Sequence, residues 1–205
     1  MNTTELKDDH RPRIGVLALQ GDYDAHALAL RDVGAEPILV RKPEELADLD
    51  GLIIPGGEST TFLKFLERGG FLASLQDFVR HKPTFGTCAG CILLATEVTH
   101  PPQDSLGVLN ATVERNAYGR QIDSSIQTGD TKLTGGPLEM VYIRAPRIVK
   151  TGPGVQILAE RDGFPVLVEQ GHILAATFHP ELSQDRRVHQ RFVDLVRSHA
   201  EQPSR

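Results

Sequence analysis

The stretch Phe85-Gly86-Thr87-Cys88-Ala89-Gly90 places a cysteine between two glycines in the spacing Gly-x-Cys-x-Gly. This is the thiol counterpart of the nucleophile elbow Gly-x-Ser-x-Gly, a sharp turn between a strand and a helix. Glycine suits such a turn because side chains beside the nucleophile would collide. The apolar run 91–95 predicts a helix whose N-terminus favours the thiolate form of Cys88. The stretch therefore indicates a nucleophilic cysteine, and the alternative is a buried structural cysteine.

Outward from this elbow, apolar runs alternate with helical patterns. Strands are expected over 14–19, 37–40 and 51–54, and helices over 22–33, 43–49 and 71–79. Ser59 is expected to cap a further helix that carries Phe62, Leu63 and Leu66 on one face. Strands and helices in alternation predict right-handed βαβ units. The predicted fold class is therefore α/β: a single-domain, flavodoxin-like, doubly wound and mostly parallel sheet.

The second half of the chain predicts an antiparallel elaboration. Leu109, Ala111 and Val113 alternate with polar residues, which is typical of a half-buried, antiparallel strand. The polar, glycine-rich segment 123–137 predicts a loop. Further strands are expected over 140–144, 156–160, 166–169 and 173–178, with a closing helix over 185–199. Residues 1–12 are expected to be a disordered polar leader, 13–200 one domain and 201–205 a polar tail.

The bulk properties exclude several classes of protein. The chain has 205 residues and a net charge of −5, which gives no electrostatic case for binding nucleic acid or an anionic membrane. No apolar run approaches the length of a membrane span. The two cysteines, Cys88 and Cys91, are three residues apart and provide no disulfide framework. The expected location is the cytoplasm.

His179 is the best-placed partner for a catalytic thiol, which needs a base. It directly follows the expected strand 173–178, and open α/β sheets bind ligands at the carboxyl ends of their strands. Pro180 restricts the chain so that, in an extended conformation, His179 and Glu181 project to the same side. We therefore predict a triad of Cys88, His179 and Glu181. The alternative is a surface turn with an incidental histidine.

Other histidines and the second cysteine have ordinary interpretations. His26, His189 and His199 lie on expected helices, where solvated side chains are the expectation. Cys91 completes a Cys-x-x-Cys spacing with Cys88, but a redox motif of that kind belongs in a thioredoxin-like context, which is missing here. We expect Cys91 to be a small helix residue that faces the core.

The stretch Pro55-Gly56-Gly57-Glu58-Ser59 lies at the carboxyl end of another expected strand. Two glycines let the backbone approach a ligand and turn its N–H groups outward. Attack of a thiol on a carbonyl group makes an oxyanion, which needs fixed hydrogen-bond donors. The backbone N–H groups of Gly57 and Ala89 are the predicted pair. The alternative is a plain strand-to-helix turn closed by a Ser59 cap.

These motifs together resemble those of class I, triad-type glutamine amidotransferases. The stretches that carry this resemblance are Gly86–Gly90, Pro55–Ser59 and Phe178–Glu181. The resemblance narrows to the family of glutaminase subunits of pyridoxal 5′-phosphate synthase through Leu19–Gly21, Pro55–Thr61, Glu114–Gln121, Ile143–Pro146 and Phe178–Leu182. It runs from about Arg13 to about Arg197. Cys91 departs from it, because the family generally has a larger apolar residue there.

The resemblance implies that L-glutamine is hydrolysed to glutamate and ammonia through a thioester on the triad cysteine. It implies that the ammonia passes to a synthase subunit that makes pyridoxal 5′-phosphate in a large hetero-oligomer, with no cofactor and no metal in this chain. By the same resemblance, the glutamine-binding positions are Gly57, Glu58, Ser59, Arg115, Ile143 and Arg144. The chemistry agrees, since Glu58 can accept the ammonium group of glutamine and Arg115 can bind its α-carboxylate.

Two alternatives remain open from the sequence. The chain could be the glutaminase of another amidotransferase, such as those of imidazole or purine biosynthesis, and only the stretches 114–121 and 143–146 argue against this. It could also be a non-catalytic subunit that binds and regulates a partner. The intact set of Cys88, His179 and Glu181 argues against that second alternative.

Overall fold

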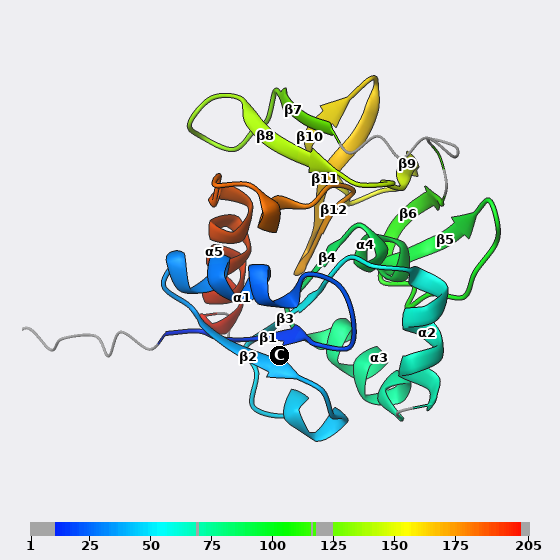
Figure 1. Cartoon of the computed structure of the whole chain (residues 1–205), viewed down its shortest axis with the longest axis vertical. Helices are drawn as coiled ribbons and strands as arrows, with labels where there is room; N and C mark the ends of the chain where they lie inside the picture. The colour runs from blue at the N-terminus through cyan, green and yellow to red at the C-terminus, as the bar shows by residue number, and fades with distance from the viewer. Residues whose placement is uncertain (1–10, 69, 116, 118–124, 202–205) are drawn as a thin grey trace, which may run out of the picture.

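A seven-stranded sheet forms the centre of the computed structural model, which describes residues 11–68, 70–115, 117 and 125–201 (Figure 1). Its strands, in spatial order, are β10 (Gln156–Arg161), β11 (Phe164–Gln170), β12 (Ile173–Ala176), β4 (Thr84–Thr87), β3 (Gly51–Ile54), β1 (Arg13–Leu17) and β2 (Glu36–Val40). The strands from β12 to β2 are parallel, and β10 and β11 extend the sheet with antiparallel pairing. This arrangement confirms the predicted fold class.

Helices cover both faces of the sheet. They are α1 (Tyr23–Asp32), η1 (Pro43–Leu46), α2 (Ser59–Arg68), α3 (Phe71–His81), α4 (Ala89–Leu94), η2 (Pro180–Leu182) and α5 (Arg187–Ala200). Ile53 of β3 belongs to the apolar cluster that contains residues of α1 and α5, whereas Leu52 and Ile54 belong to the cluster that contains residues of α2, α3 and α4. Alternate residues of a strand point to opposite faces, so these two groups of helices lie on opposite sides of the sheet.

Five further strands form two small sheets beside the central one. The three-stranded sheet has the order β5 (Ala95–Thr99), β6 (Leu109–Glu114) and β9 (Arg147–Thr151), and the two-stranded sheet pairs β7 (Ser125–Gly129) with β8 (Leu138–Tyr142). The antiparallel prediction for β6 is correct only toward β9, because β6 pairs with β5 in parallel. The predicted loop over 123–137 is wrong where β7 lies. No residue of this strand is fully buried, and it lacks the apolar run that marks a buried strand.

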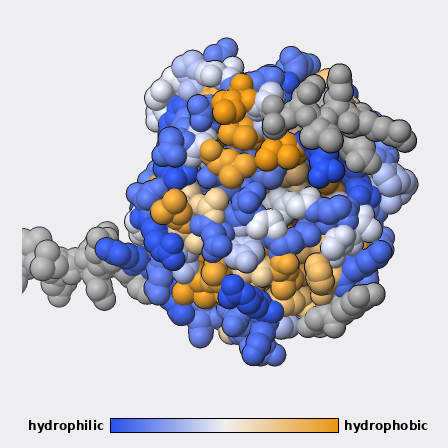
Figure 2. All heavy atoms as spheres, in the orientation of Figure 1, coloured by the Kyte–Doolittle hydropathy of each residue, from blue (hydrophilic) through white to orange (hydrophobic). Residues whose placement is uncertain are grey.

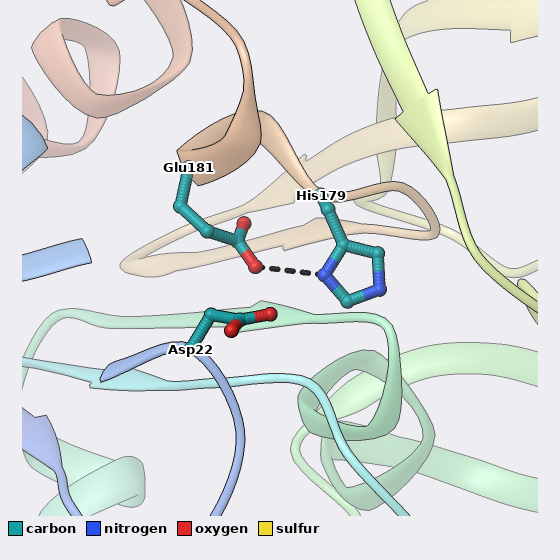
Figure 3. A group of neighbouring side chains, drawn as sticks. All are labelled: Asp22, His179 and Glu181. Carbon is teal, nitrogen blue, oxygen red and sulfur yellow. Dashed lines mark hydrogen bonds and ion pairs between the residues drawn. The ribbon is translucent and has the colours of Figure 1, made fainter. Parts of the chain in front are cut away.

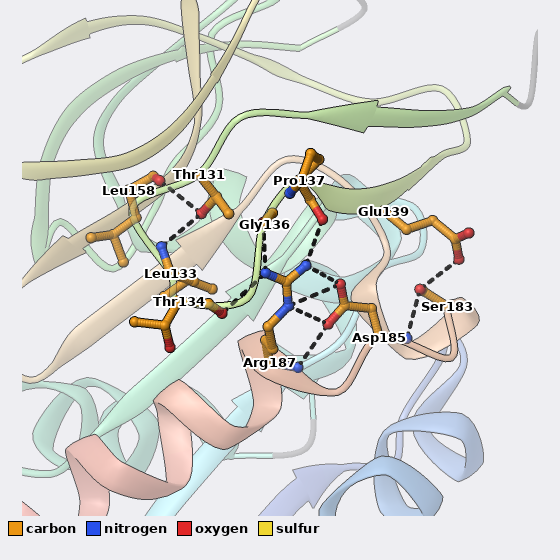
Figure 4. A network of polar contacts seen from close by, with 10 residues as sticks. All are labelled: Thr131, Leu133, Thr134, Gly136, Pro137, Glu139, Leu158, Ser183, Asp185 and Arg187. Carbon is orange, nitrogen blue, oxygen red and sulfur yellow. Dashed lines mark hydrogen bonds and ion pairs between the residues drawn. The ribbon is translucent and has the colours of Figure 1, made fainter.

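Arg187, at the start of α5, ties the polar segment before β8 to the rest of the domain (Figure 4). Its guanidinium donates hydrogen bonds to the backbone oxygens of Gly136 at 2.7 Å and Pro137 at 2.6 Å. The carboxylate of Asp185 accepts from the same guanidinium at 2.6 Å. These charge-assisted bonds fix the segment that leads into β8, and the residues just after β8 reach the cleft described below.

Helix α2 begins differently from the prediction. The carboxylate of Glu58 accepts hydrogen bonds from the backbone N–H groups of Thr60 at 3.0 Å and Thr61 at 2.7 Å. Ser59 is instead the first residue of the helix, and its hydroxyl donates to Gln103 at 2.8 Å. The predicted Ser59 cap is therefore wrong, and Glu58 caps the helix.

Polar side chains predominate on the face shown in Figure 2, where apolar ones form separate patches. The large apolar side chains exposed among the described residues are Leu28, Phe65, Ile126, Val149 and Leu182. Scattered apolar side chains are usual on protein surfaces and do not by themselves mark a docking site. Within residues 11–201, leaving out the undescribed positions, no helix combines the length and apolarity needed to cross a membrane. The predicted leader over 1–12 lies almost entirely outside the described residues, as does most of the predicted tail.

Candidate active site

A cavity of about 310 Å³ opens where the carboxyl ends of β1, β3, β4 and β12 come together. The parallel strand order β2-β1-β3-β4-β12 changes direction between β1 and β3, and open α/β sheets bind ligands at such a switch point. The volume is within the range of small-molecule sites. The lining residues are Gly21, Asp22, Gly57, Glu58, Ser59, Cys88, Ile92, Arg115, Ile143, Arg144, Pro146 and His179. All six predicted glutamine-binding residues therefore line one cavity together with Cys88 and His179.

Cys88 occupies a strained turn between β4 and α4. Its φ of 49° and ψ of −104° are unusual for a residue with a side chain. The flanking glycines permit this turn, because a Cβ on Gly86 would lie 2.6 Å from the backbone of Gly90, and a Cβ on Gly90 would lie 2.0 Å from the carbonyl oxygen of Ile54. The geometry is that of a nucleophile elbow. Cys88 is largely buried and borders the cavity.

His179 and Glu181 face one another, and the ring Nδ1 lies 2.7 Å from the carboxylate Oε1 (Figure 3). Both side chains are buried. The juxtaposition was predicted, but its cause differs from the prediction. Pro180 begins a single 3-10 turn rather than an extended segment, and this turn brings the carboxylate under the imidazole. The backbone N–H of His179 also donates to Val141 of β8 at 2.8 Å, which fixes the position of the ring.

The charges around His179 favour its imidazolium form. Burial alone would lower the pKa of His179, but hydrogen bonds with Cys88 and Glu181 and the charges of both groups raise it to about 10. Burial alone would raise the pKa of Glu181, but the neighbouring His26 and His179 lower it to about 2. A buried carboxylate thus faces a ring that readily holds a proton, and that ring contacts the thiol.

Gly56 gives His179 its place beside Cys88. A Cβ on Gly56 would lie 2.5 Å from Cε1 of His179 and 3.4 Å from Cβ of Cys88, so a side chain there would push the imidazole away. The next residue, Gly57, has a φ of 129° and lies against the side chain of Gln20. Gly57 lines the cavity and Ala89 begins α4 directly after Cys88. Their role as oxyanion donors remains a prediction.

Glu58 and Arg115 are paired with each other in the cavity. Nη2 of Arg115 lies 3.2 Å from Oε1 of Glu58 and donates to the hydroxyl of Thr60 at 2.8 Å. Burial alone would raise the pKa of Glu58, but hydrogen bonds from Thr61 and Thr60 lower it to about 2. Ile143 and Arg144 follow β8, and Arg144 has a φ of 43°. The two groups predicted to bind the ends of glutamine are therefore charged and adjacent.

Donor atoms of Asp22, His179 and Glu181 lie within 4.8 Å of one another (Figure 3). Such a group has the residue types of a metal site. However, Nδ1 of His179 is the ring nitrogen that is hydrogen-bonded to Glu181. A nitrogen that binds a metal ion cannot also carry the proton for this hydrogen bond. We therefore interpret His179 and Glu181 as a pair of the predicted triad, with Asp22 beside them, and assign no metal to the group.

Two buried histidines behind Glu181 were not predicted. His26 of α1 and His189 of α5 are both fully buried, so the prediction of solvated side chains is wrong for them. The spacing of apolar residues along the two helices could have revealed this burial. Leu30 lies four residues after His26, and Phe192 lies three residues after His189, so each histidine shares the apolar face of its helix.

The sequence pattern of the SNO glutamine amidotransferase family matches residues 16–198. The chain belongs to this family. Two members with 60% and 51% identity, from Koribacter versatilis and Mycobacteroides abscessus, are PdxT subunits of pyridoxal 5′-phosphate synthase. Each alignment covers 91% of this chain, with 96% of the first relative and 98% of the second.

Two solved structures resemble this chain. A crystal structure of a glutamine amidotransferase has a TM-score of 0.83 and 46% identity, covering 89% of this chain and 98% of its own. A protein of Thermoplasma acidophilum, described as a putative component of GMP synthase, has a TM-score of 0.71 and 18% identity, covering 94% of this chain and 97% of its own. The second likeness shows the fold alone.

Proposed function

We propose that this chain is the glutaminase subunit of a pyridoxal 5′-phosphate synthase. It hydrolyses L-glutamine to glutamate and ammonia and passes the ammonia to a synthase subunit within a cytoplasmic hetero-oligomer. The observation that carries the chemistry is the buried His179–Glu181 pair beside the strained Cys88. The choice of the synthase as ammonia acceptor is supported by relatives of 60% and 51% identity that are subunits of pyridoxal 5′-phosphate synthase.

The reaction begins with proton transfer from the thiol of Cys88 to His179. The thiolate attacks the side-chain amide carbon of glutamine, and the resulting oxyanion lies between the N–H groups of Gly57 and Ala89. Protonated His179 then gives its proton to the leaving ammonia, so the carbon–nitrogen bond breaks and a thioester forms. Water activated by His179 hydrolyses the thioester, which releases glutamate and regenerates the thiol.

Glu181 determines which nitrogen of His179 takes part. Its carboxylate accepts a hydrogen bond from Nδ1–H at 2.7 Å, so Nε2 is the nitrogen that exchanges a proton with Cys88. The same contact stabilises the imidazolium that forms when the thiol ionises. The raised pKa of His179 and the lowered pKa of Glu181 both favour this charge distribution.

Glutamine binds by taking over charges that are paired in the free protein. Its ammonium group replaces the guanidinium of Arg115 at the carboxylate of Glu58, and its α-carboxylate binds to Arg115. Both exchanges replace one charge-assisted contact with another, so neither leaves a charge unpaired. Ile143 contributes backbone groups, and Arg144 lies at the exposed edge of the cavity.

The alternative acceptors have weaker support. The GMP synthase component shares the fold at only 18% identity, whereas the pyridoxal phosphate relatives reach 60%. The stretches 114–121 and 143–146, which favour this branch by resemblance, include Arg115, Ile143 and Arg144 of the cavity. A purely regulatory role has less support, because docking a partner does not require a buried His179–Glu181 pair beside a strained cysteine.

The deciding experiment compares two cysteine variants. Cys88→Ala should abolish ammonia release from glutamine while glutamine still binds, because the attacking atom is lost and the cavity remains. Cys91→Ala is the matched control. Burial and the nearby Cys88 raise the pKa of Cys91 to about 12, so its thiol is not a nucleophile and activity should be kept. Turnover by Cys88→Ala at near the wild-type rate would contradict the proposal.

A second measurement tests the acceptor. Ammonia release should rise when a pyridoxal 5′-phosphate synthase subunit is added, and it should not rise with the acceptor subunits of GMP synthase or of imidazole biosynthesis. Activation by one of those acceptors instead would keep the glutaminase mechanism and overturn the assignment of the branch.

A further inference from the structure

A buried line of polar groups continues from Glu181 toward α5. The carboxylate Oε1 is hydrogen-bonded to His179, while Oε2 has no hydrogen-bond partner among the described residues. The nitrogen that faces Oε2 is Nε2 of His26, 3.4 Å away. On the other side of that ring, Nδ1 of His26 lies 3.0 Å from Nε2 of His189. The line thus joins His179, Glu181, His26 and His189 through elements that are far apart in the sequence.

Burial favours the neutral form of His26 and of His189. Burial lowers the pKa of His26 and of His189, although the nearby carboxylate of Glu181 opposes this for each. A neutral imidazole carries one donor nitrogen and one acceptor nitrogen. The hydrogen bond between the two rings therefore has only two possible directions, and the remaining contacts decide between them.

In one direction, Nδ1–H of His26 donates to His189. Nε2 of His26 then has no proton to offer to Glu181, and Nδ1 of His189 carries a buried proton although no acceptor is within reach in the described structure. A buried N–H group without a partner is rare and costly. This direction leaves both ends of the line unsatisfied.

In the other direction, Nε2–H of His189 donates to Nδ1 of His26. The proton of His26 is then on Nε2, where it is shared between Oε2 of Glu181 at 3.4 Å and the hydroxyl of Thr87 at 3.2 Å. The bare nitrogen at the end of the line is Nδ1 of His189, and an unpaired acceptor costs less than an unpaired donor. This direction turns an N–H group, rather than a bare nitrogen, toward Oε2 of Glu181.

We propose that His26 is a positioning residue of the triad: its Nε2–H holds the second oxygen of Glu181, and His189 fixes the tautomer in which that proton is available. The inference rests on the proposed function, since it concerns the same active site. His26 touches neither substrate nor thiol and acts only through Glu181. Without it, no N–H group faces the buried Oε2. The carboxylate is then less stable as an anion, so Glu181 holds the imidazolium of His179 less strongly.

Other charged groups surround this line of polar side chains. The titratable or charged groups on the elements packed around Glu181 include Asp22 before α1, Cys88 before α4, Glu139 on β8, and Arg186 and His189 at the start of α5. Helix α1 also carries Asp24, Arg31 and Asp32, and Asp185 and Arg187 lie where α5 begins. Glu139 accepts from Ser183 at 2.6 Å instead of facing Glu181. Asp22 is exposed to solvent. Of these groups and His26 itself, His26 is the one within 3.4 Å of Oε2.

The first test measures the tautomer in the wild-type protein. Nitrogen chemical shifts of the histidine rings, recorded by NMR near pH 7, should show His26 as neutral with its proton on Nε2. A proton on Nδ1 of His26 would overturn the proposal. This readout needs no variant and no turnover, so it stands whether or not the chain proves to be a glutaminase.

The second test compares His26→Leu and His26→Gln with Phe85→Leu in the full chain, with and without the synthase subunit. Phe85 packs edge-on against the rings of His26 and His189, so Phe85→Leu loosens the same core but leaves the polar line intact. We expect His26→Leu to lower kcat about 10-fold or more with little change in KM. His26→Gln, which keeps a donor, should recover part of that loss.

The pH profile separates positioning from loss of stability. The rate of Cys88 alkylation by iodoacetamide follows the thiolate, which the imidazolium of His179 stabilises. We expect the profile of His26→Leu to shift about one unit toward higher pH and that of Phe85→Leu to stay in place. An unshifted profile for His26→Leu, or an equal shift for Phe85→Leu, would overturn the proposal. If the wild-type protein does not turn over glutamine but the alkylation profile of His26→Leu is still shifted, only the proposed function is contradicted.

Discussion

The cleft contains two ion pairs that differ in how they are held. At its inner end, His179 and Glu181 are both buried, and their atoms are 2.7 Å apart. At its outer end, Arg115 and Glu58 are 3.2 Å apart, and the side chain of Glu58 is 56% exposed. If one partner of the inner pair is removed, the other is left as an unpaired charge in the protein interior. At the outer pair, water can take the place of the lost partner.

This difference assigns the two pairs to different steps of the proposed reaction. The inner pair is fixed by β12, η2 and the backbone of β8, so its geometry is set before substrate arrives. At the outer pair, Glu58 is accessible to solvent, and the charges of the pair match the two ends of glutamine, so substrate can separate it. We therefore expect changes at the inner pair to act on kcat and changes at the outer pair to act on KM.

The largest effect is expected for His179→Asn. Proton transfer from Cys88 and protonation of the leaving ammonia both fail, so kcat should fall about 10³-fold. Steady-state ammonia release measures this loss. The matched control is His172→Asn, because His172 lies at the opposite end of the same strand and is bonded to the backbone oxygen of Val79 at 3.0 Å. A loss below tenfold for His179→Asn would remove this residue from the triad.

Glu181→Gln should have the second-largest effect. We expect kcat to fall about 10²-fold, because the amide can still accept a hydrogen bond from His179 but carries no charge. It also has a signature in stability. The pKa of Glu181 falls from 4.5 to about 2 on folding, so its contribution to the free energy of unfolding is fully present above pH 4.5 and is lost as the pH falls toward 2. Denaturant unfolding between these pH values should therefore be less pH-dependent in Glu181→Gln. An unchanged slope would contradict the buried ion pair.

The inner pair was also the part of the site that the sequence predicted best. His179 and Glu181 are two residues apart, so their own motif brings them together, and a five-residue motif marks the turn at Cys88. The central strands were predictable for a similar reason. Strands buried on both faces appear as apolar runs, as β1 and β3 do.

The remaining features depend on contacts between distant segments. His26 and His189 are 163 positions apart, and their hydrogen bond makes sense of two polar residues on apolar helix faces. Arg115 and Glu58 are 57 positions apart, so their pairing could not be read from either motif. Strand β7 was missed because it is defined by pairing with β8, while its own residues are mostly polar.

At the outer pair, Arg115→Gln should raise KM about tenfold or more and change kcat less than threefold. A charge-assisted hydrogen bond to the α-carboxylate is lost, and such bonds contribute about 1.5–3 kcal/mol. The control is Arg191→Gln. Arg191 lies on α5 and donates to the carboxylate of Glu169 at 2.8 Å, away from the cavity, so kcat and KM should both stay unchanged. If Arg115→Gln lowered kcat and left KM unchanged, the outer pair would not be the substrate-binding pair.

The smallest effect is expected for the contribution of the outer pair to folding. A double-mutant cycle with Glu58→Gln and Arg115→Gln, measured by denaturant unfolding, should give a coupling energy below about 1 kcal/mol. Glu58→Gln alone should cost more than this coupling, because Glu58 also accepts the backbone N–H groups that begin α2. Arg115→Gln alone should cost little. A coupling energy as large as that of a buried pair would mean that the outer pair is structural, and that glutamine could separate it only at a prohibitive cost in affinity.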